Sequence, residues 1–68
     1  MEDKQNICNL LLITLQATES AADVVSIVYD NDSEIVTVTF ESGGHRKVNV
    51  TMDSGTAMIR DIMKNLGC

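Results

Sequence analysis

The sequence predicts an α+β domain in the order α-β-β-β-α, with a three-stranded antiparallel meander and two helices on one face of the sheet. Two observations lead to this prediction. Apolar residues recur at helical spacing near both ends of the chain, whereas apolar and polar residues alternate through its middle. The connections are short, so strands that follow one another in sequence should pair. The 68 residues are expected to form a single domain, 1–68.

The first helix is expected to run from Asp3 to about Ser20. Its apolar residues recur at helical spacing and cover more than half of the helix circumference. These residues are Ile7, Cys8, Leu10, Leu11, Leu12 and Leu15. Ile13 falls outside them, on the polar side of the helix. Because a surface helix normally has a narrower apolar stripe, this helix should either lie centrally or offer its extra apolar surface to a partner.

The segments expected to form strands are rich in β-branched residues and alternate between apolar and polar side chains. They are residues 24–29, 34–40 and 47–52. The side chains expected to face the helices from the second and third strands are Val36, Val38, Phe40, Val48, Val50 and Met52. The second helix should begin after a cap at Asp53 or Ser54 and end at Gly67. Its apolar stripe consists of Met58, Ile59, Ile62, Met63 and Leu66.

The first hairpin is constrained because directly opposed residues of an antiparallel pair lie on the same face of the sheet. A two-residue loop at residues 31–32 meets this condition. It pairs Ile27 with Val36 and Val25 with Val38, so that both pairs are apolar.

The second hairpin needs a three-residue loop, since a loop of the two glycines alone would oppose apolar to polar residues. Two alternatives satisfy the alternation: residues 42–44 with a left-handed glycine, or residues 43–45 with Glu41 opposite Lys47. Either loop places a basic triplet at a solvated hairpin tip, formed by His45, Arg46 and Lys47. This tip is either an ordinary polar turn or a binding point for an acidic partner.

Composition excludes several classes of function. The chain has ten acidic and five basic residues, and its net charge is −5. Proteins bind nucleic acids and anionic membranes mainly through Lys and Arg, so neither is an expected partner. The apolar run from Leu10 to Ile13 is too short for a membrane span or a signal sequence. Cys8 and Cys68 match no metal-ligand spacing, so we expect free thiols, no metal or cofactor, and a cytoplasmic location.

Two polar segments have residue types typical of chemical sites but lack the arrangement that such sites need. A nucleophile at Ser54, with Asp53 beside it, would need His45 as its base, but a strand separates them by roughly 20 Å. An N-terminal helix cap explains the same residues. The carboxylates of residues 30–34 are spaced like the start of a calcium loop, but the loop glycine is missing. We therefore expect no catalytic and no metal-binding residues, and no enzymatic activity.

The acidic residues are unevenly distributed, because none of the basic residues lies between Glu19 and Glu41. This pattern predicts an acidic face at one end of the molecule, around the first hairpin. Its candidate residues are Glu19, Asp23, Asp30, Asp32 and Glu34. Such a face serves solubility. Alternatively, it competes with nucleic acid for a basic protein.

A candidate partner surface lies on the outer face of the sheet, where Val28 is expected opposite Ile35 with Val24 nearby. If both helices cover the inner face, these side chains stay in contact with water. Together with Ile13 they form the candidate surface for a weak homodimer or for another protein.

The α-β-β-β-α order and the length resemble the double-stranded RNA-binding domain. That family grips RNA with lysines at the head of the second helix, where this chain reads "DSGTAMIR", residues 53–60, with no lysine. The resemblance therefore implies the shape and not the RNA-binding residues. The segment "VNVTMDSGTAMIRDIM", residues 48–63, is similar to small acidic proteins of prophages and conjugative elements. Some of those proteins block host defence nucleases by mimicking nucleic acid.

The sequence favours a small non-enzymatic module for protein interaction or regulation. Two alternatives stay open: an acidic inhibitor that mimics nucleic acid and targets a nucleic-acid-binding protein, and a degenerate double-stranded RNA-binding domain.

Overall fold

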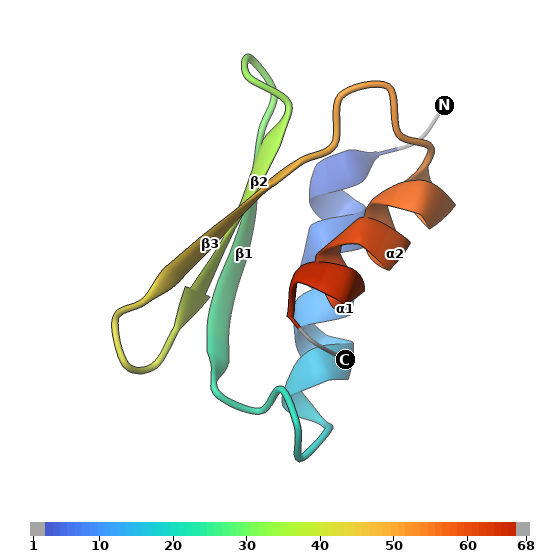
Figure 1. Cartoon of the computed structure of the whole chain (residues 1–68). Helices are drawn as coiled ribbons and strands as arrows, with labels where there is room; N and C mark the ends of the chain where they lie inside the picture. Colours follow the sequence, from blue (N-terminus) through green and yellow to red (C-terminus); the bar gives the residue numbers. More distant parts are fainter. Residues whose placement is uncertain (1–2, 67–68) are drawn as a thin grey trace.

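The computed structural model describes residues 3–66 and has the predicted order of elements (Figure 1). The elements are α1 (Lys4–Gln16), β1 (Val24–Asp30), β2 (Ile35–Phe40), β3 (His45–Asn49) and α2 (Gly55–Asn65). The three strands form an antiparallel sheet in the order β1-β2-β3. Both helices lie on the same side of this sheet. The predicted α+β meander is therefore confirmed.

The core lies between the inner face of the sheet and the two helices. It contains buried side chains from every element and from the flanking turns: Cys8, Leu15, Ala21, Val24, Ile27, Val36, Val38, Val48, Val50, Met58 and Ile62. Helix α1 packs mainly against β1, and α2 crosses α1 and approaches β3. The core is aliphatic, as expected from a chain with one Phe and one Tyr.

Helix α1 begins where the sequence predicts and ends earlier. The Oδ1 atom of Asp3 accepts the backbone N–H of Asn6 at 3.0 Å, which caps the first turn. The helix ends at Gln16 and not near Ser20. Beyond it, the Thr18 hydroxyl donates to the Leu15 carbonyl at 2.7 Å and accepts the N–H of Ala21 at 3.2 Å. These bonds stabilise a turn in place of further helix.

The first hairpin differs from the predicted one. Its loop has the four residues 31–34, and the register is displaced so that Ile27 pairs with Val38 and not with Val36. The Oδ1 atom of Asp30 accepts the N–H groups of Asp32 and Ser33 at 2.9 and 3.3 Å, which organises the longer loop. The loop closes through a residue in the left-handed conformation, Glu34, with φ +56°.

A β-bulge at the start of β1 overturns another expectation. The register shifts between Val24 and Ser26, so two residues of β1 occupy the space of one on β2. As a result Val24 is fully buried and pairs with Phe40, whereas Val25 is 47% exposed. The predicted pairing of Val25 with Val38 is therefore wrong.

The second hairpin has a three-residue loop with a left-handed glycine, as predicted. The loop lies at a different position in the sequence. It is formed by residues 41–43, with Gly43 at φ +92° and its N–H donating to the Phe40 carbonyl at 2.8 Å. A left-handed residue here favours glycine. Both predicted loops are one or two residues too late in the sequence. Glu41 therefore lies in the loop, and Lys47 pairs with Thr37.

Strand β3 is correspondingly earlier than predicted and ends at Asn49. Val50 is fully buried as expected, but Met52 is 95% exposed rather than inward. A turn explains the difference, because the N–H of Asp53 donates to the Val50 carbonyl at 3.0 Å and Met52 has φ +65°. Ser54 caps α2 by accepting the N–H of Ala57 at 3.2 Å.

Helix α2 buries the predicted stripe in part. Met58 and Ile62 are fully buried, while Ile59 is 37% exposed. Leu66 is the C-cap residue. Gly67, expected to end the helix, and Cys68, expected to be a free thiol, lie outside the described residues.

Candidate interaction surfaces

The two edges of the sheet differ in the hydrogen bonds that they form with side chains of the rest of the chain. At the β1 edge, the N–H of Tyr29 donates to the Gln5 side-chain oxygen at 2.9 Å. The Gln16 side-chain amide donates to the Val24 carbonyl at 2.9 Å. Both glutamines belong to α1, one near each end of the helix. Helix α1 therefore protects β1 from pairing with another strand.

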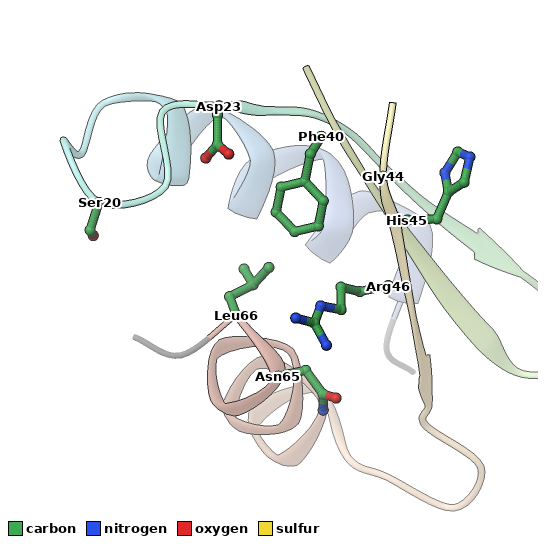
Figure 2. A pocket seen from close by; sticks show the side chains of 8 residues that line it. All are labelled: Ser20, Asp23, Phe40, Gly44, His45, Arg46, Asn65 and Leu66. Atoms are coloured by element: carbon green, nitrogen blue, oxygen red, sulfur yellow. The ribbon is translucent and has the colours of Figure 1, made fainter. Parts of the chain in front are cut away.

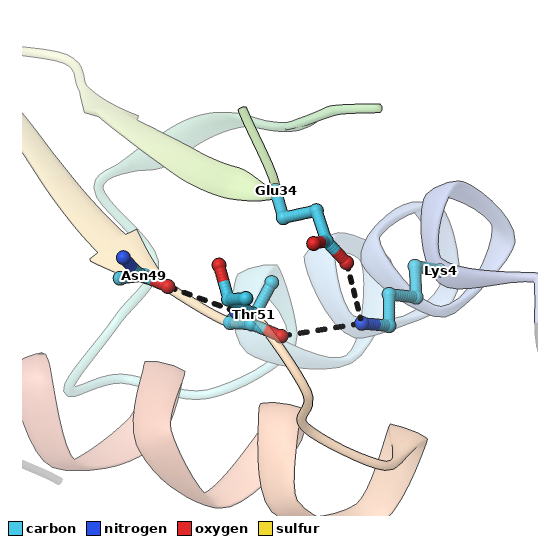
Figure 3. Close-up of polar contacts among 5 residues, drawn as sticks. Lys4, Glu34, Asn49 and Thr51 are labelled. Carbon is cyan, nitrogen blue, oxygen red and sulfur yellow. Dashed lines mark hydrogen bonds and ion pairs between the residues drawn. The ribbon is translucent and has the colours of Figure 1, made fainter. Parts of the chain in front are cut away.

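Lys4 holds the start of α1 against the end of the sheet where the first hairpin lies and β3 ends (Figure 3). Its Nζ donates to the Val50 carbonyl at 3.2 Å and lies 3.8 Å from a carboxylate oxygen of Glu34. It also lies 5.7 Å from the centre of the Tyr29 ring. The Lys4 side chain is only 16% exposed. One member of the predicted acidic face, Glu34, is therefore occupied in a structural ion pair.

A groove lies between β3 and α2. The part beside the second hairpin has a volume of about 490 Å³ and is lined by Ser20, Asp23, Phe40, Gly44, His45, Arg46, Asn65 and Leu66. Figure 2 shows the Arg46 side chain directed across this space toward the end of α2. A second hollow of about 450 Å³ continues along β3 and is lined by Lys47, Val48, Asn49, Asp61, Lys64 and Asn65.

The predicted basic tip of His45, Arg46 and Lys47 does not form one cluster. These residues belong to β3, where successive side chains point to opposite faces of the sheet. Arg46 pairs with the buried Val38, so its side chain lies on the helix side of β3 and not at the hairpin tip, although it remains exposed as expected. His45 lies on the outer face, where its Nδ1 is 3.1 Å from the hydroxyl of Thr39. Lys47 lies on the same face, two residues further along.

The outer face of the sheet carries part of the predicted partner surface. Val28 is 52% exposed, and Ile35 is partly exposed on the neighbouring strand. They are diagonal neighbours and not directly opposed, because Val28 pairs with Thr37. Val24 does not belong to this surface, since the bulge turns it into the core with no exposed area. The exposed Val25 was missed, because strict alternation assigned it to the inner face.

Ile13 is 66% exposed but lies on a different side of the molecule from Val28. Cys8 and Leu15 mark the buried side of α1, and at helical spacing Ile13 points away from them. Leu10, expected within the buried stripe, is 57% exposed beside it. The candidate residues therefore form two separate apolar surfaces, one on α1 and one on the outer face of the sheet.

The predicted acidic face is divided between the two ends of the sheet. Glu19 and Asp23 lie in the connection before β1, close to the second hairpin, where the N–H of Glu41 donates to the Asp23 carbonyl at 2.8 Å. Asp30 and Asp32 lie at the opposite end of β1, at the first hairpin. The length of a strand separates the two groups, so the expected single acidic end does not form.

Two carboxyl groups interact near α2, that of Asp53 just before the helix and that of Asp61 within it. The pKa of Asp53 is raised by a hydrogen bond with the Asp61 side chain, with burial and repulsion by Asp61 adding to it and the charges of Lys4 and Arg60 opposing it. Ser54 serves as the cap, and His45 lies at the other end of β3.

Neither a metal-holding cluster nor a membrane-spanning helix is found within residues 3–66. No group of three or more His, Cys, Asp and Glu side chains there is arranged to hold a metal ion. In that same range, none of the helices has the length and apolar character needed to cross a membrane. The buried thiol of Cys8 has its pKa raised to about 11 by desolvation, which makes it a poor nucleophile.

Comparison of the chain with family models, with curated proteins and with solved structures gave no match.

Proposed function

We propose that this chain is a small non-enzymatic interaction module that binds another protein through the outer face of its sheet. A second copy of the chain is the partner we favour. The observation that supports this proposal is the one-sided packing of the fold. Both helices lie on the inner face, and the outer face leaves Val25, Val28 and Ile35 at the surface.

The expected strength of this contact follows from the area available. Burying a valine or isoleucine completely contributes about 1.5–3 kcal/mol. About half of Val25 and Val28 remains exposed, at 47% and 52%, so each contributes about half of that amount. A symmetric contact buries each side chain once in each copy. The total is comparable with the lower end of the roughly 4–15 kcal/mol cost of association, so the dimer should be weak.

Sedimentation of the full chain from low to high micromolar concentration tests this proposal. The double variant Val28→Thr/Ile35→Thr keeps β-branched side chains in the strands and removes apolar area. The matched control is Leu10→Gln/Ile13→Gln, which removes two exposed apolar side chains from the opposite side of the molecule.

We expect the parent chain and the α1 control to dimerise and the sheet variant to stay monomeric. A parent chain that is monomeric throughout contradicts the homodimer. A dimer that is lost only in the α1 variant moves the contact to Leu10 and Ile13.

A further inference from the structure

We propose that the free edge of β3 binds an extended acidic segment of a partner protein as a fourth strand of the sheet. This site is distinct from the outer-face contact proposed above. It combines a row of unpaired backbone groups with basic side chains on both faces of the strand.

The backbone of β3 is available on one side. Hydrogen-bonded and non-bonded pairs alternate along an antiparallel ladder. The N–H of Phe40 donates to the Gly44 carbonyl at 2.9 Å, and the N–H of Val50 donates to the Glu34 carbonyl at 3.0 Å. The intervening bonded pairs are then those of Arg46 and Val48, which leaves the alternate residues facing away from β2.

The residues that face away from β2 are His45, Lys47 and Asn49. Within residues 3–66, no hydrogen bond connects their backbone N–H or C=O groups to a side chain or loop. This edge contrasts with β1, where Gln5 accepts the N–H of Tyr29 and Gln16 donates to the carbonyl of Val24. Only one edge of the sheet is thus protected by side chains of the chain's own helix.

The charges around β3 identify the kind of strand that fits. The strand carries Arg46 on the inner face, Lys47 on the outer face and no acidic residue. Lys64 of α2 lines the adjoining hollow. In the described part of the chain, the ion pair found within 4 Å is that of Lys4 and Glu34, so these three cations are unpaired. Asp23 and Asp61 also line these two hollows, but they come from the connection before β1 and from α2 and not from the strand.

An added strand whose acidic side chains all lie on one face brings them beside Lys47 when that face is the outer one. A second copy fits this edge poorly, because β3 paired with itself in antiparallel orientation brings like charges together, either the two Lys47 side chains on the outer face or the two Arg46 side chains on the inner face. A nucleic acid is also disfavoured, since the chain as a whole has a net charge of −5.

The test is a titration of the isotopically labelled full chain with the synthetic peptide Ac-EVETEVE-NH2, followed by amide chemical shifts. The controls are Ac-KVKTKVK-NH2, which reverses the charge, and Ac-EVEPEVE-NH2, whose central proline cannot donate a backbone hydrogen bond. Short duplex RNA at low salt is titrated separately.

We expect saturable shifts centred on Lys47 and Asn49 with the acidic peptide, and no saturation with the basic peptide. The proline peptide and the variant Lys47→Glu should each bind about tenfold more weakly. The side chain of Lys47 is exposed, so this variant is expected to fold, which circular dichroism checks. Val28→Thr/Ile35→Thr should bind the peptide like the parent, which separates this site from the dimer contact.

Four results would each overturn the proposal. They are the absence of saturable shifts with the acidic peptide, shifts centred on β1 or the outer-face valines, equal binding of the proline peptide, and saturable binding of RNA in place of the peptide.

Discussion

Replacing the two glutamines of α1 that protect the β1 edge should destabilise the fold without disturbing its core. In Gln5→Ala the N–H of Tyr29 loses its acceptor, and in Gln16→Ala the carbonyl of Val24 loses its donor. A hydrogen bond of this kind contributes about 1 kcal/mol net. For a domain of this size, each variant should lower the Tm by roughly 4–8 °C. Thermal unfolding followed by circular dichroism measures this shift.

The two positions require opposite chemistry, which provides matched controls. Gln5→Glu keeps an oxygen that accepts the Tyr29 N–H, and Gln16→Lys keeps a donor for the Val24 carbonyl. Both should stay closer to the parent Tm than the alanine variants do. If the alanine variants and their controls unfold at the same temperature, these bonds do not stabilise the edge and the reasoning is refuted.

Three further predictions concern the core and the titrating groups. Met58→Ala removes the largest fully buried side chain and should cost about 2–5 kcal/mol of unfolding free energy in urea titrations; a smaller loss would contradict its burial. In a Cys68→Ser background, Cys8 should react with a thiol reagent at pH 7.5 only on unfolding, because burial raises its pKa to about 11; rapid labelling of the native chain would contradict this. Because the folded pKa of Asp53 is raised above its usual value of 3.8, its pairing with Asp61 destabilises the fold as pH rises through that pKa. Asp61→Asn should therefore raise the Tm at pH 7 and lose this advantage on acidification below pH 4; an equal gain at both pH values would contradict the coupling.

The elements of the fold could be predicted from sequence because their patterns are local. The period-two alternation of Val36 and Val38 and the helical spacing of Met58 and Ile62 place these residues in the core, where the structure has them. The strand registers could not be predicted in the same way. Facing parity leaves open every register that differs by a multiple of two residues, and both hairpins differ from the prediction by such a step.

The candidate surfaces were harder to predict because they depend on irregular backbone. The bulge in β1 exchanges the roles of Val24 and Val25, and no residue type near it signals a bulge. Arg46 follows the alternation of β3, but its inward direction appears only once the second hairpin loop is placed at 41–43. The bonds of Gln5 and Gln16 to β1 join residues far apart in sequence, so local patterns do not reveal them.

Amide hydrogen exchange of the free chain tests most directly whether the sheet has one protected edge and one open edge. We predict slow exchange at Tyr29, whose N–H is bonded to Gln5, and at Arg46 and Val48, which pair with β2. Lys47 and Asn49, which face away from β2, should exchange markedly faster. Slow exchange at Lys47 matching that at Arg46, or fast exchange at Tyr29 matching that at Lys47, would contradict this arrangement of the edges.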